Sequence, residues 1–171
     1  GDCAQPCRWK YMLSEEKRPG QYFPIEETAD GTHLFNAQDL CMIDHLPQLR
    51  QAGIDSLKIE GRAKSSYYVS VITAAYRSAI RHYEQNGWDS PLPDWIQQEV
   101  QKVSHRAYST GFFFGEPSQN HKDGGYIRSY EVIAVVEGYE DGHLVLSQRN
   151  HFRTGEEADV LCPGEPPFCM T

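Results

Sequence analysis

The sequence predicts an α/β protein followed by a small all-β segment, and three observations support that expectation. A short strand-like segment, residues 56–60, ends in a glycine turn at Gly61 and leads into a long stretch with helical spacing. After Gly87, a turn-rich linker precedes a second amphipathic stretch. From Tyr108 onward the pattern changes to short β-rich runs joined by glycine-containing turns.

The central unit is expected to run strand, turn, helix. Leu57 and Ile59 are the apolar positions of the strand, Ser65 or Ser66 starts the helix, and Gly87 ends it. Steps of three and four predict that the helix buries one face, formed by Val69, Ile72, Tyr76, Ile80 and Tyr83. Residues at the carboxyl end of such a strand line the functional face of parallel α/β proteins.

Two further helices flank this unit. The first is expected between Asp39, a helix cap, and Gly53, with a bend or restart at Pro47. The second is expected over Trp95 to Arg106 and should bury Ile96, Val100 and Val103. The cations Lys102, His105 and Arg106 would lie at its C-terminal end, where the helix dipole favours them, although His105 alternatively reads as a plain surface residue.

Short β-strands are expected at both ends of the chain. Residues 9–28 predict a hairpin, and 31–36 a further extended segment. Residues 126–139, 143–148 and 157–161 predict a small β-barrel or β-sandwich with a turn at 140–142. The expected division is therefore a β/α part at 1–107, a linker at 108–125 and a β domain at 126–171. The aromatic triplet 112–114 either stacks on nucleotide bases or packs between domains.

Composition bounds the classes of function. The 171 residues are 39% hydrophobic and carry a net charge of −8, which argues against broad, nonspecific nucleic-acid binding. Residues 58–82 nevertheless hold four net positive charges. No apolar run approaches the roughly 18 residues of a membrane helix, and the first seven residues do not form a signal peptide, so a cytoplasmic protein is expected. Five cysteines without secretory features favour metal or free-thiol roles over disulfides.

The charged residues after the predicted strand are the first candidates for chemistry. The catalytic candidates are Lys58, Glu60 and Arg62, and the substrate-binding candidates are Lys64, Tyr67 and Tyr68, with His33 weaker. The cations could hold carboxylates or phosphates, Arg62 in bidentate fashion, while Glu60 would orient Arg62 or act as an acid or base. The alternative is a structural ion-pair network.

Metal-binding and nucleophile motifs are sparse in the sequence. Cys3 and Cys7, three residues apart, could supply two ligands to a metal centre that needs four, or be structural thiols. Neither His-Glu-x-x-His nor Gly-x-Ser-x-Gly occurs. Ser104 and His105 are neighbours on a predicted helix and would point about 100° apart, so they do not form a nucleophile and base pair.

Several blocks of the chain closely resemble the collagenase-like peptidases, peptidase family U-thirty-two. They are residues 1–11, Glu-Glu-Lys-Arg-Pro-Gly at 15–20, Asp-Leu-Cys at 39–41, 53–62 with Lys-Ile-Glu-Gly-Arg, Ser-His-Arg at 104–106, Thr-Gly-Phe at 110–112 and Gln-Arg-Asn at 148–150. The resemblance spans residues 1 to about 162. It implies a partial TIM-like β/α barrel followed by a small C-terminal β domain, and a chain that begins partway through the family's sequence.

The same resemblance implies a 4Fe-4S cluster in the full-length protein. Cys3 corresponds to the third ligand, and either Cys7 or Cys41 to the fourth, while two earlier cysteines of the family have no counterpart here. A cluster is therefore not expected on this piece alone, which is expected to be inactive by itself.

The branch most resembled implies oxygen-independent hydroxylation of a tRNA uridine at C5, with prephenate and tRNA as partners. A protease, as the family name says, is the alternative enzyme. An RNA-binding or partner-binding module is the alternative outside enzymology. The sequence leaves open whether the chain forms a homo-oligomer.

Overall fold

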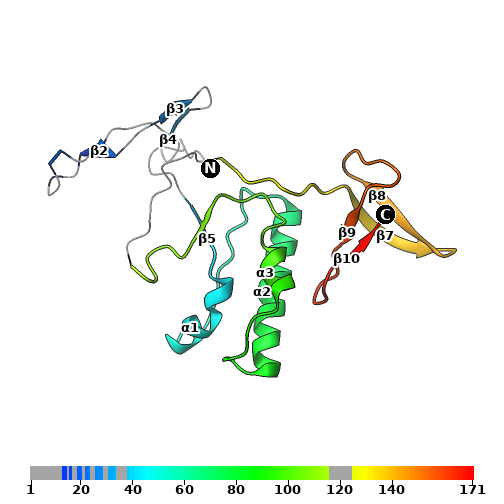
Figure 1. Cartoon of the computed structure of the whole chain (residues 1–171), viewed down its shortest axis with the longest axis horizontal. Coiled ribbons are helices and arrows are strands. Elements are labelled where there is room, and N and C mark those ends of the chain that lie inside the picture. The colour runs from blue at the N-terminus through cyan, green and yellow to red at the C-terminus, as the bar shows by residue number, and fades with distance from the viewer. Residues whose placement is uncertain are drawn as a thin grey trace. The chain divides into compact units, whose positions relative to one another are not determined.

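The computed structural model describes residues 38–115 and 125–171, the short strands before residue 34, and the turn residues 16, 19 and 20 (Figure 1). The chain divides into two compact units, residues 1–41 with 105–127 and residues 42–104 with 128–171. The predicted division at 107 and 125 stays a prediction.

The first unit consists of paired short strands. β1 (Leu13–Ser14) pairs antiparallel with β2 (Tyr22–Phe23), which confirms the predicted hairpin, and β3 (Glu26–Thr28) pairs antiparallel with β4 (Gly31–His33). β5 (Asp39–Leu40) pairs in parallel with β6 (Tyr108–Ser109). The predicted helix cap at Asp39 is wrong. Its carboxylate instead accepts hydrogen bonds from the Arg106 backbone N–H at 3.0 Å and from Nε at 3.1 Å.

His105 in this unit is a buried residue, not a surface one. Its side chain is 2% exposed and its ring stacks on Tyr108, with centroids 4.1 Å apart and planes 5° from parallel. Nδ1 lies 2.7 Å from the Arg106 carbonyl oxygen and donates to it, because a carbonyl can only accept. The ring is therefore held by a backbone group and an aromatic face.

In the second unit, a short 3₁₀ turn (Ile43–His45) runs directly into α1 (Leu46–Gln51). Pro47 lies in the first turn of α1, where its missing N–H has no helical partner to lose, so the predicted restart at Pro47 is confirmed. The helix ends before Gly53, whose N–H donates to Arg50 O at 2.9 Å.

Helix α2 (Ser66–Asn86) begins and ends as predicted. The Ser65 hydroxyl accepts a hydrogen bond from the Tyr68 N–H at 3.2 Å, and Gly87 follows the last turn. The buried face differs from the prediction, because Val69 is 39% exposed. The residues that α2 buries are Val71, Ile72, Ala75, Ser78, Ala79 and Tyr83. Counting only large apolar residues overlooked the alanines, whose small side chains let a neighbouring element approach closely.

The predicted strand at 56–60 is wrong. Residues 54–61 have no regular secondary structure, and Ile54 and Leu57 are 49% and 38% exposed. A strand needs a neighbour to satisfy its backbone groups, and no described strand pairs with this segment. The described residues therefore show mixed helix and strand content without a closed barrel, and the TIM-like part of the predicted fold stays a prediction.

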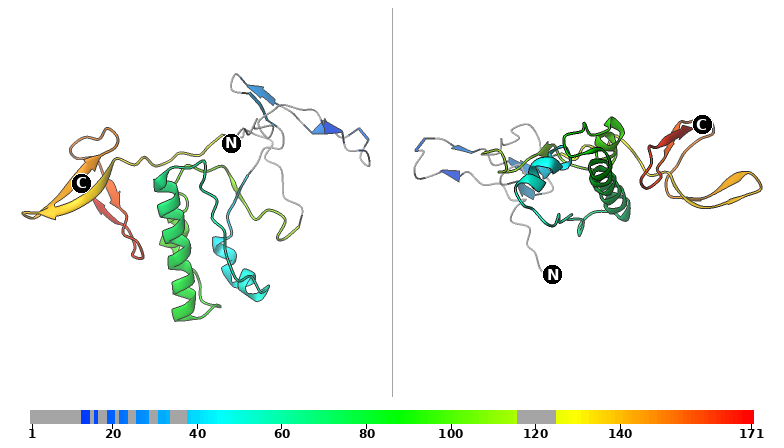
Figure 2. Two further views of the ribbon diagram at one scale, coloured as in Figure 1. Left: turned by 180° about the vertical axis from the view of Figure 1, so that it is seen from behind. Right: turned by 90° about the horizontal axis from the view of Figure 1, so that it is seen from below.

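Helix α3 (Asp94–Glu99) is shorter than the predicted helix over 95–106. The chain continues in tight turns, with Lys102 N donating to Glu99 O at 3.0 Å. The predicted apolar face is nevertheless correct, because Ile96, Val100 and Val103 are at most 2% exposed. Helix α3 packs against α2, and α1 lies to one side of α2 in both views of Figure 2. The buried side chains of the three helices form the core of this unit. No helix among the described residues is both long and apolar enough to cross a membrane.

Residues 134–170 contain strands and turns only. β7 (Ala134–Glu140) and β8 (His143–Gln148) form an antiparallel hairpin, and β9 (Ala158–Val160) pairs antiparallel with β10 (Phe168–Met170). Asp141 and Gly142 both have positive φ, as a two-residue hairpin turn requires, which confirms the turn predicted at 140–142. The first strand begins at Ala134 and not near 126 as predicted. Whether these hairpins form a barrel or a sandwich stays a prediction.

Lys102 joins the helical part of this unit to β9. Its Nζ lies 2.8 Å from Glu99 Oε1 and 2.8 Å from Asp159 Oδ2, and its side chain is 6% exposed. Burial lowers the pKa of Lys102, but the hydrogen bonds and charges of Asp159 and Glu99 outweigh burial and raise the pKa above 10.5. The sequence predicted Lys102 at the C-terminal end of a helix, where the dipole favours a cation, and the structure places it in a buried ion-pair cluster after α3.

We expect Lys102→Met to destabilise the protein by about 3 kcal/mol, because it leaves the buried Glu99 carboxylate without its counter-charge. The free energy of unfolding from urea titration measures the change. Lys58→Met is the matched control, since Lys58 is 85% exposed and its loss should cost less than about 0.5 kcal/mol. Equal costs for both substitutions would contradict a stabilising role for the cluster.

Lys102 also predicts a pH dependence. A folded-state pKa raised above 10.5 means that its contribution is fully present below that pH and is lost as pH rises through the raised value. The difference in unfolding free energy between wild type and Lys102→Met should therefore be constant below pH 10.5 and shrink above it. Measuring the difference removes the contribution of Tyr83, whose pKa is raised by burial and by the Asp44 charge. Burial raises the pKa of Tyr67 and the Lys102 charge opposes that rise, so Tyr67 is replaced by phenylalanine in both proteins to keep its titration out of the difference. A difference that grows with pH would refute the assignment.

Candidate functional site

The predicted catalytic residues lie together in the loop before α2, which we call the 58–64 loop. Lys58 Nζ is 3.6 Å from Glu60 Oε2, and the Arg62 backbone N–H donates to Glu60 Oε1 at 2.9 Å. All three side chains are exposed. Glu60 thus organises the loop through the backbone of Arg62, and an exposed guanidinium remains beside it.

The protonation state of Glu60 limits its role. The hydrogen bond from the Arg62 backbone N–H, followed by the positive charge of Lys58, lowers the pKa of Glu60 below 4.5. The carboxylate is therefore ionised at neutral pH. It can accept a proton or orient a cation, but it is a poor general acid.

The predicted substrate-binding residues point to two different places. Lys64 Nζ donates to Ser104 O at 3.4 Å and lies 4.9 Å from the centre of the Tyr68 ring. Tyr67 donates its hydroxyl to Lys102 O at 3.4 Å, and burial, followed by the Glu99 charge, raises its pKa. Lys64 and Tyr68 therefore remain next to the loop, whereas Tyr67 belongs to the Lys102 cluster.

The predicted metal ligands are only partly within the described residues. Cys3, Cys7 and the side chain of His33 lie outside them. Cys41 follows β5, and its N–H donates to Ser109 O at 2.9 Å. Among the described residues, no group of three or more His, Cys, Asp or Glu side chains is placed to hold a metal ion. The described donors do not by themselves fit a 4Fe-4S cluster.

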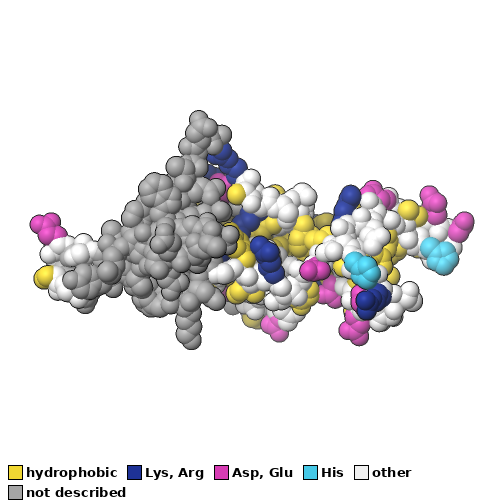
Figure 3. Space-filling model, turned by 90° about the horizontal axis from the view of Figure 1, so that it is seen from above, with side chains coloured by type: hydrophobic (Ala, Val, Ile, Leu, Met, Phe, Trp, Pro, Cys, Tyr) yellow, Lys and Arg dark blue, Asp and Glu magenta, His cyan; other side chains and the backbone are white. Residues whose placement is uncertain are grey.

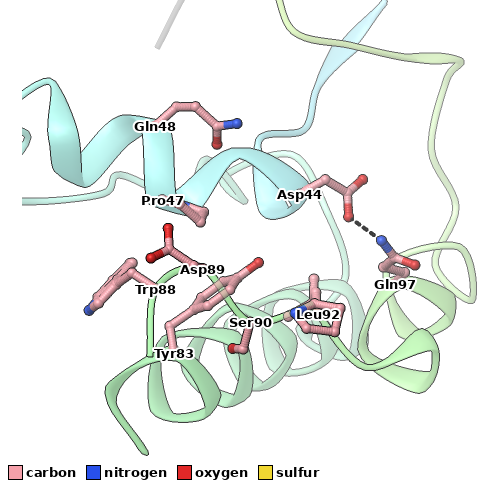
Figure 4. Close-up of a pocket in the computed structure, with 10 residues that line it drawn as sticks. Asp44, Pro47, Gln48, Tyr83, Trp88, Asp89, Ser90, Leu92 and Gln97 are labelled. Atoms are coloured by element: carbon pink, nitrogen blue, oxygen red, sulfur yellow. Dashed lines mark hydrogen bonds between the residues drawn. The ribbon is translucent and has the colours of Figure 1, made fainter. Parts of the chain in front are cut away.

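A cavity of about 360 Å³ lies between α1, the C-terminal end of α2 and the loop that follows it (Figure 4). Its residues are Asp44, Pro47, Gln48, Tyr83, Trp88, Asp89, Ser90, Pro91, Leu92 and Gln97. Tyr83 and Trp88 stack with ring centres 5.3 Å apart, and Gln97 Nε2 donates to Asp44 Oδ1 at 2.7 Å. We call this cavity the α1–α2 pocket. None of the catalytic, substrate-binding or metal-binding residues predicted from the sequence lines it.

A serine, a histidine and an asparagine meet at the edge of this pocket. Ser90 Oγ is 3.2 Å from His82 Nε2, and Asn86 Nδ2 is 3.3 Å from His82 Nδ1. Nε2 also lies 2.9 Å from Pro91 O, so it carries the ring proton, and Ser90 donates its own proton to Gly87 O at 2.6 Å. His82 thus cannot accept the serine proton through Nε2, and the trio closes the end of α2 without forming an activated nucleophile.

These features define a mixed helix and strand protein with an exposed charged loop at the start of its longest described helix. The family model described as Peptidase family U32 matches residues 1–123, and the chain belongs to that family. The resemblance noted from the sequence is thereby confirmed.

Its relatives carry two kinds of name. The chain is 43% identical to an uncharacterised protease of Methanocaldococcus jannaschii, over 82% of this chain and 35% of the relative. It is 33% identical to tRNA hydroxylation protein P1 of Bacillus subtilis, over 100% of this chain and 42% of the relative. It is 28% identical to a collagenase of Porphyromonas gingivalis, over 68% of this chain and 27% of the relative. The chain thus spans less than half the length of each, and no solved structure matches it.

Gly61 is the residue on which the shape of the 58–64 loop depends. A Cβ at this position would come within 2.5 Å of a Val69 methyl group, and Val69 is β-branched and stiff. We expect Gly61→Ala to destabilise the protein by roughly 1–3 kcal/mol and to displace the loop. Adding Val69→Ala should recover most of the loss, measured by urea unfolding. No recovery would show that the close approach is not the constraint.

Proposed function

We propose that the protein containing this chain hydroxylates tRNA, and that the 58–64 loop contacts the RNA or the hydroxylation donor. The exposed Lys58 and Arg62, in the loop that leads into α2, carry the proposal. A helix N-terminus attracts anions, and an arginine fork matches a phosphate or carboxylate. Relatives named as tRNA hydroxylation proteins, at 27–33% identity over most of the chain, support the same reaction class.

The finer features of the reaction belong to the proposal as well. Prephenate is the proposed donor, the uridine C5 the proposed target, and a 4Fe-4S cluster in the full-length protein the proposed cofactor. Prephenate carries two carboxylates, which Arg62 and Lys58 could bind, while ionised Glu60 would hold the Arg62 backbone in place. Lys64, packed on Tyr68, would form the second side of the anion site. A cytoplasmic location would follow from a tRNA substrate.

The distribution of charge favours a local contact over a broad one. On the face drawn in Figure 3, basic side chains of the described residues lie singly among acidic, polar and hydrophobic ones. With a net charge of −8, long-range attraction to RNA is weak, so recognition would depend on short-range contacts such as those of Arg62.

No specific observation favours peptide hydrolysis. His105 is buried, with Nδ1 bonded to a backbone carbonyl, and the Ser90 proton is directed to Gly87 O and away from His82. A serine or histidine mechanism therefore finds no support among the described residues.

The test replaces Lys58 and Arg62 by alanine in the full-length protein and measures hydroxylated uridine in cellular tRNA by mass spectrometry. We expect the hydroxyl to disappear or to fall at least about tenfold, because two anion contacts are lost at once. The double substitution Arg77→Ala with Arg81→Ala is the matched control. It also removes two exposed cations, but they lie on the order of 20 Å along α2 from its first residue, Ser66.

Two results would overturn the proposal. One is unchanged tRNA hydroxylation in a strain that lacks the full-length protein. The other is loss of collagen or peptide cleavage in that strain while its tRNA is unaltered, which would favour a peptidase. Normal hydroxylation by the Lys58 and Arg62 variant alone would remove only the role assigned to the 58–64 loop.

A further inference from the structure

We propose that the α1–α2 pocket binds a cationic nitrogen group, an ammonium or a guanidinium. The pocket is separate from the 58–64 loop and is independent of the proposed function. Two carboxylates and the hydroxyl of Tyr83 line it beside a pair of stacked aromatic rings.

The carboxylates supply the charge. Asp44 and Asp89 both line the cavity, and both residues are exposed enough to be reached from solvent. Asp44 uses Oδ1 to accept from Gln97, which fixes its orientation and keeps Oδ2 for another donor. No described residue forms an ion pair with Asp89. A bound ammonium could therefore pair with one carboxylate in a pocket to which both contribute negative charge.

Tyr83 gives a second, independent indication of a ligand. Its side chain is 3% exposed, its hydroxyl points toward the Asp44 side of the cavity (Figure 4), and it makes no hydrogen bond to a described residue. The phenol oxygen faces the cavity, so a group bound there can be its hydrogen-bond partner. A cation bound beside Asp44 would donate to this oxygen.

The aromatic rings already hold one cation of the chain. Trp88 stacks on Tyr83, and the guanidinium carbon of Arg50 lies 4.4 Å from the centre of the Trp88 ring. Because Arg50 occupies this cation–π position, an incoming cation would be held by the carboxylates and the Tyr83 hydroxyl. The volume of about 360 Å³ is at the lower end of the range for small-ligand pockets, enough for a short amine or for one lysine or arginine side chain.

The orientation of α2 adds to the attraction. The C-terminal end of a helix carries a partial negative charge, and Tyr83 lies in the last turn of this 21-residue helix. Polyanions such as RNA are disfavoured at the same place by Asp44 and Asp89. The ligand is therefore a different molecule from the one proposed for the 58–64 loop.

The test titrates the protein with n-butylammonium and n-butylguanidinium and follows Trp88 fluorescence, with Trp9 and Trp95 replaced by phenylalanine. We expect both cations to change the emission, while n-butanol of the same length does not. Asp89→Asn and Asp44→Asn should each weaken binding by about tenfold, because each removes a charged hydrogen-bond partner. Glu84→Gln should have no effect, because it removes the same charge from an exposed residue of α2 that does not line the pocket.

A second arm compares these amines with a tetralysine peptide and distinguishes the source of the cation. Tighter binding of the peptide indicates a basic protein segment, and equal binding indicates a free amine, and both results support the site. Equal binding of butanol, or binding unchanged by Asp89→Asn and Asp44→Asn, overturns the proposal. Tyr83→Phe keeps the ring and removes the hydroxyl, so it should weaken binding of the cations by a smaller factor than the two aspartate substitutions. Urea unfolding checks that this variant folds.

Discussion

The buried face of α2 is the constraint on which the described helical part depends. Ala75 and Ala79 are at most 2% exposed, and their small side chains let the segments around Ile43 and Ile96 pack closely against the helix. Tyr76 also links α2 to the segment before α1, because its hydroxyl accepts a hydrogen bond from the Met42 N–H at 2.9 Å. With α2 held along its length, both of its ends are fixed, and each end supports one of the two candidate sites.

The candidate sites at the two ends of α2 carry opposite charges, and each site has the same sign as the partial charge of the helix dipole at that end. Lys58 and Arg62 lie beside the N-terminal end, and a bound anion there would face both the cations and the partial positive charge of the helix. Asp44 and Asp89 lie beside the C-terminal end, where a bound cation would face carboxylates and a partial negative charge. At each end, the side chains have the same sign as the helix dipole there. A bound ligand of the opposite sign would therefore be attracted by both the side chains and the dipole.

Local signals predicted the limits of α2, and long-range contacts decided what they could not. Ser65 caps the N-terminal end of the helix and Gly87 follows its C-terminal end with a positive φ, so both limits could be predicted from local sequence. The segment 56–60 was predicted as a strand because Leu57 and Ile59 alternate with polar residues, but pairing depends on a partner that alternation cannot supply. Lys102 and His105 were predicted as cations at the C-terminal end of a helix. Only the fold brings Asp159, 57 residues away, to Lys102, and Tyr108 against His105.

The candidate sites follow the same division. The 58–64 loop was found because its residues are consecutive and charged. The α1–α2 pocket was missed because Asp44, Tyr83 and Asp89 come from three segments, and each residue alone reads as a surface acid or a core aromatic. A signal was present between Tyr83 and Ser90, where an aromatic residue in the last turn of a long helix is followed by a second aromatic residue, an acid and a serine, but nothing in the sequence joins them to Asp44.

The two sites should act independently of each other. Between Ser66 and Tyr83 the helix rises about 26 Å, at 1.5 Å per residue. The Debye length at physiological ionic strength is about 8 Å, so charges at one end are largely screened from the other. An anion at the 58–64 loop is therefore not repelled by Asp44 and Asp89, and a cation in the pocket does not compete with Lys58 and Arg62. Coupling between them would have to pass through a movement of α2, and the close packing of Ala75 and Ala79 resists that movement.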